Sequence, residues 1–257
     1  MKLAISGKGG VGKTTLAALL AKAFQGKGYR VLCVDADPDA NLAGALGIAD
    51  ADKIVPIAEM KQLIEERTGA KAGTMGGFFK INPKVEDLPD ALSREKDGIK
   101  LMVLGTVKSG GSGCICPESV LLKNLIQHLL LRRDEVIIMD MEAGLEHLGR
   151  GTAFAVDLML VVVEPGRRSL ETAAAVQKLA GEIGIKKIAA VGCKVRSEKD
   201  AAFLAQALTI PFLGSIPFRD EIIQADLEGK PAYEVAADLL VNAESLATQI
   251  ERMVAAG

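Results

Sequence analysis

The sequence predicts an α/β fold, with a single doubly wound, mostly parallel sheet and helices on both faces. Short apolar runs alternate with longer stretches that carry apolar residues at helical spacing from one end of the 257-residue chain to the other. Several runs are apolar at successive positions, which is typical of strands covered on both faces. Aromatic residues make up only 4% of a chain that is 49% hydrophobic, and this composition favours helices packed on a parallel sheet over an aromatic-rich sandwich.

The order of these segments gives the expected elements. We expect strands at residues 3–6, 31–34, 99–104, 136–139, 158–163, 188–191 and 212–216. Helices are expected at residues 14–27, 117–131, 169–183, 197–208 and 232–253. Residues 49–94 are less regular and are interpreted as an insertion on one rim, with a charged helical part at 59–67 and a short strand at 77–81. The chain 1–257 is therefore expected to form one domain.

Composition and charge exclude several classes of function. The net charge of −2 gives no general basic surface, so no nucleic-acid partner is expected. The chain opens directly on a strand-like run without the layout of a signal peptide, and no apolar stretch reaches the roughly 20 residues of a membrane span. We expect a cytoplasmic protein that does not enter a membrane.

A glycine-rich loop follows the first expected strand and opens the first expected helix. It consists of Gly7, Lys8, Gly9, Gly10, Val11, Gly12, Lys13 and Thr14. This is the P-loop pattern in its proper strand–helix context. Its glycines let backbone N–H groups surround phosphate oxygens, and the helix N-terminus adds a positive dipole end. Lys13 reaches the β and γ phosphates and the Thr14 hydroxyl ligates Mg²⁺, so the pattern predicts a P-loop NTPase that binds ATP or ADP.

Carboxylates follow two other apolar runs. The run at 31–34 continues into Asp35, Asp37 and Asp39, and the run at 136–139 ends at Asp140. Strand C-termini form the ligand crevice of a doubly wound sheet, so these acids are expected near the γ-phosphate. A hydrophobic strand ending in Asp is the arrangement that holds Mg²⁺ in such enzymes. For Asp39, ordinary turn chemistry is an equally good explanation.

The four cysteines fall into two groups. Cys33 and Cys193 lie in apolar runs and are expected in the core, whereas Cys114 and Cys116 share the glycine-rich loop 110–117 between a strand and a helix. Two thiolates at this spacing supply half of a tetrahedral site for Zn²⁺, Cu⁺, Ni²⁺ or an iron–sulfur cluster, and a two-fold dimer would supply the other half. A redox pair and two unpaired thiols are the alternatives.

The loop with its early lysine resembles the deviant Walker A motif of the MinD, ParA and nitrogenase iron-protein superfamily. The resemblance implies a homodimer in the ATP state, in which Lys8 contacts the nucleotide of the opposite subunit. It also implies that Asp37 contacts the attacking water and the Mg²⁺ shell, with Asp35 in support. The segment 141–147, which ends at His147, corresponds to the switch II region.

Taken together, the P-loop, the aspartate string at 35–39, the Cys-x-Cys loop and the segment 140–147 resemble the CooC group. These are nickel-insertion accessory ATPases that mature carbon monoxide dehydrogenase, and related members serve acetyl-CoA synthase. The resemblance implies that Cys114 and Cys116 bind Ni²⁺ or Zn²⁺ across the dimer interface. It also implies a Mg-dependent ATPase with apo carbon monoxide dehydrogenase or acetyl-CoA synthase as its client.

The same resemblance indicates where the nucleotide is held beyond its phosphates. By position, Thr15 and a base-contacting set are implied, consisting of Cys193, Lys194, Pro217, Phe218 and Arg219. One departure stands out, because the family commonly has Asn where this chain has Cys193. A thiol replaces poorly an amide that both donates and accepts hydrogen bonds.

Two other functions use the same motifs. A positioning ATPase of the MinD or ParA kind would need a C-terminal amphipathic membrane helix or a basic DNA-binding face, and the acidic residues of the tail at 243–253 argue against binding to anionic lipid. An electron-transfer ATPase would carry an iron–sulfur cluster on the two loop cysteines.

Overall fold

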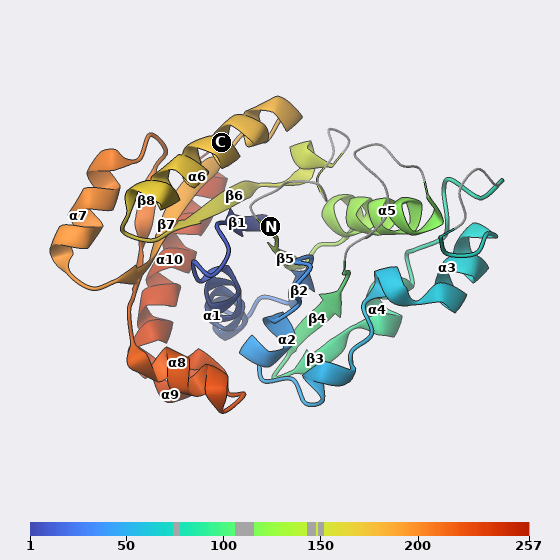
Figure 1. Cartoon of the computed structure of the whole chain (residues 1–257), viewed down its shortest axis with the longest axis horizontal. Helices are drawn as coiled ribbons and strands as arrows, with labels where there is room; N and C mark the ends of the chain where they lie inside the picture. Colours follow the sequence, from blue (N-terminus) through green and yellow to red (C-terminus); the bar gives the residue numbers. More distant parts are fainter. Residues whose placement is uncertain (74–77, 106–115, 143–147, 149–151, 257) are drawn as a thin grey trace.

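The computed structural model describes residues 1–73, 78–105, 116–142, 148 and 152–256 (Figure 1). Their strands form one eight-stranded sheet in the order β3-β4-β2-β5-β1-β6-β7-β8. Every neighbouring pair is parallel except β3 with β4, which is antiparallel. The strands are β1 (Lys2–Gly7), β2 (Val31–Asp35), β3 (Arg94–Lys96), β4 (Ile99–Val103), β5 (Val136–Asp140), β6 (Leu158–Val163), β7 (Ile188–Val195) and β8 (Phe212–Pro217). The expected doubly wound α/β class is confirmed.

Helices cover both faces of this sheet. One face carries α1 (Lys13–Gly26), α2 (Leu42–Ala45), α8 (Asp220–Leu227), α9 (Ala232–Val235) and α10 (Ala237–Ala255). The other face carries α3 (Lys61–Thr68), α4 (Leu88–Leu92), α5 (Pro117–Arg132), α6 (Arg167–Ile183) and α7 (Glu198–Ala207). Successive residues of each central strand point to opposite faces, so Leu3 and Ile5 join one core while Ala4 joins the other.

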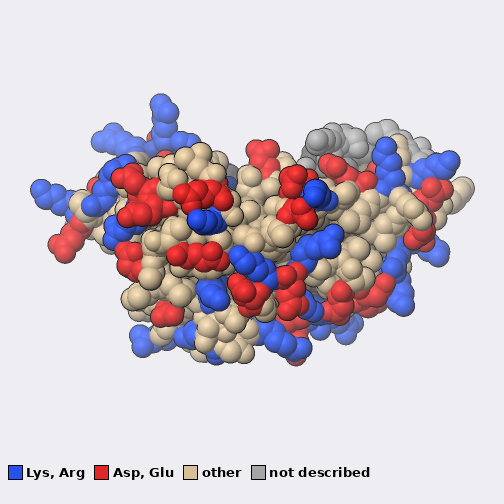
Figure 2. Space-filling view, turned by 90° about the horizontal axis from the view of Figure 1, so that it is seen from below, with Lys and Arg blue, Asp and Glu red and all other residues tan. Residues whose placement is uncertain are grey.

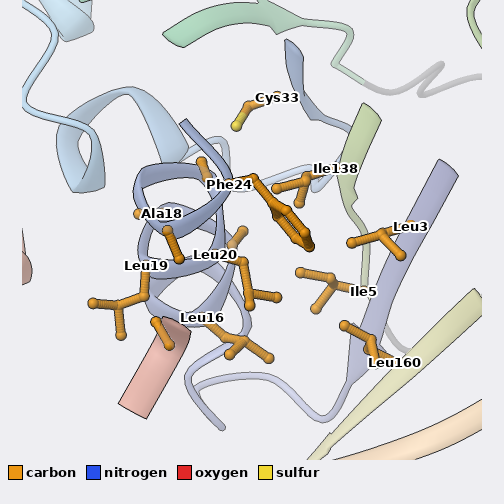
Figure 3. Close-up of a cluster of buried hydrophobic side chains, with 14 of the residues drawn as sticks. Leu3, Ile5, Leu16, Ala18, Leu19, Leu20, Phe24, Cys33, Ile138 and Leu160 are labelled. Atoms are coloured by element: carbon orange, nitrogen blue, oxygen red, sulfur yellow. The ribbon is translucent and has the colours of Figure 1, made fainter. Parts of the chain in front are cut away.

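Helix α1 forms the centre of the first core. Its apolar residues Leu16, Leu20 and Phe24 are fully buried, and Figure 3 shows them facing side chains of the sheet that include Ile5 of β1 and Leu160 of β6. The burial of this helix fixes its N-terminus at the end of β1, where the glycine-rich loop connects the two elements.

The C-terminal helix α10 packs against α1 and β8. Its apolar residues Leu239, Ala243, Leu246, Ala247 and Ile250 are buried in the same core as α1. The apolar face of this helix is therefore used inside the protein. None of the helices formed by the described residues is long and apolar enough to cross a membrane.

Several elements differ from the sequence-based expectation. Strand β3 was not expected, and it pairs with β4 through a turn in which Asp97 and Gly98 adopt positive φ. Helix α8 was not expected either. The expected helix 232–253 is interrupted at Ala236, whose φ of −137° and ψ of 89° are not helical. The strand expected at 77–81 is wrong for residues 78–81, which adopt no regular structure; residue 77 lies outside the described residues.

Charges are mixed on the surface seen in Figure 2, where acidic and basic side chains lie next to one another and neither sign forms a continuous field over that face. Ion pairs of the protein include Arg30 with Asp134 and Lys96 with Glu234. This pattern agrees with the near-neutral net charge of −2.

The packing of α1 predicts a large effect of core truncation. We expect Phe24→Ala to lower the free energy of unfolding by about 3–5 kcal/mol, because the ring is fully buried and its removal leaves a cavity. Urea denaturation measures the change. Leu227→Ala is the control, since Leu227 is 77% exposed and its truncation is expected to cost about 0.5 kcal/mol or less. Equal losses in the two variants would contradict this assignment of the core.

Candidate functional site

The glycine-rich loop leaves β1 in a conformation that depends on glycine. Gly7 has a φ of +154°, and a Cβ there would lie 2.6 Å from the carbonyl oxygen of Val162 on β6. Gly12 has a φ of +106° immediately before α1, and its carbonyl oxygen accepts the Leu16 N–H at 2.9 Å to start the helix. The loop therefore turns directly from a buried strand into a helix N-terminus, which is the geometry of a phosphate cradle.

The expected acidic residues meet beside this cradle. Asp35 of β2 and Asp140 of β5 are paired in register at the ends of neighbouring parallel strands. The Thr14 hydroxyl donates to Asp140 Oδ2 at 2.7 Å, and Lys13 Nζ lies 3.5 Å from Asp37 Oδ2. Three segments far apart in sequence thus bring a hydroxyl, an ammonium and three carboxylates to one edge of the sheet.

Burial shapes the acid chemistry of this cluster. Burial raises the pKa of Asp140 to about 7, although the hydrogen bond from Thr14 opposes the shift. Burial likewise raises the pKa of Asp35 to about 6, against the backbone N–H groups of Leu42 and Asp37 that donate to it. Asp140 Oδ1 is buried and has no hydrogen-bond partner within the described part of the chain. Such a site favours a bound cation, which would satisfy the orphaned oxygen and compensate the buried charge.

A cavity of about 550 Å³ opens next to the loop and is continuous with it through Gly12 and Thr15. It lies between the ends of β7 and β8 and includes every residue of the implied base-contacting set, Cys193, Lys194, Pro217, Phe218 and Arg219. The cavity thus extends from the phosphate cradle and has room for a nucleoside.

Contacts within this set differ from residue to residue. Lys194, in the left-handed region at a φ of +57°, donates to the carbonyl oxygen of Gly10. Cys193 is buried beside Gly12, with its Sγ 4.0 Å from the Gly12 carbonyl oxygen, and burial raises its thiol pKa to about 12. Arg219 is engaged by Asp238, with its Nη2 at 2.7 Å from Oδ2.

The remaining predicted residues are placed as follows. Lys8 is half-buried in the loop, and within the described part of the chain no acidic side chain pairs with it. Cys116 is 3% exposed, precedes the first residue of α5, and has its Sγ 3.1 Å from Ser119 Oγ. Cys114, the switch II residues 143–147 and with them His147 lie outside the described residues. No group of three or more possible metal ligands occurs among the described residues.

Several residues that line the cavity were not among the predicted site residues, and two of them are charged groups with contacts inside it. Arg196 lines it with its guanidinium carbon 3.6 Å from the centre of the Phe218 ring, and Glu164 lines it at 3.7 Å from Lys194 Nζ. The proximity of Arg196 to the implied base contact Lys194, two residues earlier, was the signal available in the sequence.

The fold and the loop define a P-loop nucleotide-binding protein. A family model described as the CobQ/CobB/MinD/ParA nucleotide binding domain matches residues 2–232, and the chain belongs to this family. An uncharacterised ATP-binding protein of Methanocaldococcus jannaschii is 49% identical over 90% of both chains. The carbon monoxide dehydrogenase accessory protein CooC of Rhodospirillum rubrum is 46% identical over 98% of this chain and 97% of its own.

Among solved structures, the septum site-determining protein MinD of Pyrococcus horikoshii, in complex with Mg-ADP, superposes with a TM-score of 0.68. The match covers 98% of this chain and 96% of that chain at 22% sequence identity. At this identity the match supports the fold alone. The match to the family model and the identity with these relatives confirm the resemblance to the CooC group and to the MinD and ParA superfamily.

The buried carboxylate predicts a pH-dependent stability in the absence of nucleotide and metal. The pKa of Asp140 rises from 3.8 to about 7 on folding, so above pH 4 the unfolded chain releases a proton that the folded chain retains, and stability falls as the pH approaches 7. Asp140→Asn removes this penalty. We expect its melting temperature in EDTA to exceed that of the wild type by a few degrees at pH 8.

The difference between the two proteins should shrink as the pH falls from about 7 towards 4. Melting curves across this range provide the measurement. A gap that stays constant with pH would show that Asp140 does not titrate in this way.

Proposed function

We propose that this protein is an ATP-hydrolysing metallochaperone that inserts nickel into carbon monoxide dehydrogenase, or into acetyl-CoA synthase. The observation that carries the proposal is the Cys-x-Cys pair, Cys114 and Cys116, in a chain that also carries the P-loop with its early lysine. This protein is also 46% identical, over nearly its whole length, to the carbon monoxide dehydrogenase accessory protein CooC of Rhodospirillum rubrum.

The residues beside the loop fit Mg²⁺. Asp140 offers a buried carboxylate oxygen to which no described residue donates a hydrogen bond. Thr14, which donates to the other oxygen of Asp140, carries the hydroxyl that ligates this ion in P-loop proteins. Hard oxygen ligands of this kind suit Mg²⁺. Thr14, Asp140 and the nearby Asp37 would hold the ion with ATP, and the ion would neutralise phosphate charge.

Hydrolysis is assigned to residues on either side of the γ-phosphate position. Lys13 extends from the helix N-terminus as a point charge for the β and γ phosphates. Asp37, 3.5 Å from the Lys13 ammonium, orients the attacking water. Lys8, which has no acidic partner among the described residues, is available to the nucleotide of a second subunit. There it would stabilise transition-state charge as an arginine finger does.

A homodimer in the ATP state would bring two Cys-x-Cys loops together and supply four thiolates for Ni²⁺ or Zn²⁺. Cys116 immediately precedes α5, and the next element along the chain, β5, ends at Asp140. Helix α5 and strand β5 therefore connect the metal loop to the nucleotide site along the chain. Because ATP favours the closed dimer, it changes metal affinity by the free-energy difference between the two states.

Lys8→Ala tests the role of the early lysine. We expect ATP-driven dimerisation to be lost in sedimentation velocity experiments and turnover to fall by about 10³-fold, as for loss of an arginine finger. ADP binding to the monomer should persist. Lys123→Ala, at an exposed position of α5, is the matched control. Undiminished dimerisation together with normal turnover in Lys8→Ala would remove this role.

Metal analysis tests the cysteine site. We expect the wild type with ATP to retain one Ni²⁺ or Zn²⁺ per two chains after gel filtration, and the double variant Cys114→Ser/Cys116→Ser to retain none. Cys33→Ala is the control, because Cys33 is fully buried in β2 and should leave the metal content unchanged. Equal metal content in the wild type and the double variant would refute the metallochaperone. An absorption band from iron and sulfide would favour electron transfer instead.

A further inference from the structure

The nucleoside cavity contains a flat cationic group, the Arg196 guanidinium, to which no role has been assigned above. The Arg196 guanidinium carbon lies 3.6 Å from the centroid of the Phe218 ring, and both residues line the cavity beside Gly12 and Thr15. A guanidinium that lies on an aromatic ring at this distance leaves its second planar face available for another stacking partner. Arg196 itself is exposed, whereas Phe218 is half-buried beneath it.

The backbone holds this pair in place from both sides. Val195 pairs with Pro217 where β7 and β8 end, and the Phe218 N–H donates to the Val195 carbonyl oxygen at 2.9 Å. On the other side, the Arg196 N–H donates to Asp200 Oδ2 at 3.0 Å at the start of α7. The stacked pair is thus preorganised by two secondary-structure elements, which lowers the entropic cost of using it for binding.

The polar groups that could read the edge of a base are largely engaged elsewhere. Arg219 donates to Asp238 and to the Phe218 carbonyl oxygen. Lys194 reaches the P-loop at the Gly10 carbonyl oxygen. The Oδ2 atom of Asp200 also accepts from the Ser197 N–H, completing a capping box for α7.

Cys193 adds little to hydrogen-bond recognition of the base edge. Burial raises the pKa of its thiol to about 12, so the group remains a neutral thiol, which is a weak donor and a weak acceptor. A site that makes few hydrogen bonds to its ligand discriminates poorly between ligands of the same shape, whereas a hydrogen-bonding site rejects the wrong one by about 10⁴-fold or more.

We propose that Arg196 and Phe218 form a stacking platform for the nucleotide base, and that the pocket holds purine nucleotides mainly by stacking, with weak selection between adenine and guanine. Every purine has a π-face, so stacking is tolerant of base identity. Bases stack readily on Arg guanidinium planes in other proteins. This inference rests on the proposed nucleotide binding and specifies how the base is held.

Calorimetric titration with Mg-ADP and Mg-GDP tests the platform, because the diphosphates avoid hydrolysis and ATP-driven dimerisation. We expect the wild type to prefer ADP by less than about a hundredfold. Arg196→Ala should weaken ADP and GDP alike by roughly ten- to a hundredfold. Arg196→Lys keeps the charge but loses the plane and should not restore affinity. Arg94→Ala, on edge strand β3 at the opposite side of the sheet from β8, is the matched control.

Three results would overturn the platform while leaving nucleotide binding intact. The first is an ADP preference above about a hundredfold, and the second is full affinity in Arg196→Lys. The third is a preference between the two nucleotides that disappears in Asp200→Asn, which would show that the Asp200 carboxylate recognises the hydrogen-bonding edge of the base. Failure of the wild type to bind either nucleotide would instead refute the proposed function itself, and with it the platform.

Discussion

The parallel register of β2, β5 and β1 is the constraint on which the site depends. It places Asp35 opposite Asp140 and Asp140 beside Ile5, two residues before Gly7 opens the phosphate loop. A slip of one residue would turn either carboxylate to the opposite face of the sheet. Because both faces of these strands are packed by helices, such a slip would also bury the wrong side chains, so core packing and site geometry specify the same register.

The sequence predicted the parts of the molecule that follow from local pattern. Short apolar runs, several of them continuous, predicted the seven parallel strands. The rule that ligands bind at strand C-termini predicted Asp37 and Asp140 beside the P-loop. The edge strand β3 was missed because Arg94, Glu95 and Lys96 have no apolar alternation. Its pairing depends on the positive φ of Asp97 and Gly98 in the turn to β4.

The base pocket was harder to predict, because its properties come from contacts across the sheet rather than along the chain. No local pattern indicates that Arg219 is held by Asp238 or that Arg196 stacks on Phe218, since each contact joins residues about twenty positions apart. The sequence did show that Cys193 lacks the hydrogen-bonding capacity of an amide. The stacked pair of Arg196 and Phe218, which would replace that capacity, depends on the ends of β7 and β8 lying side by side (Figure 1).

A weakly selective base pocket is compatible with a nucleotide-driven switch, because the two functions use different atoms. In the proposed function, closure of a dimer would respond to the γ-phosphate, which the cradle at Lys13 and the acids at 35–37 would sense at the ends of β1 and β2. The base would lie at the far end of the cavity, between β7 and β8. Its contacts would set how tightly nucleotide is held in both states, and a contact that is equal in two states does not shift the equilibrium between them. The energy that would open and close a metal site is therefore decided at the phosphate end.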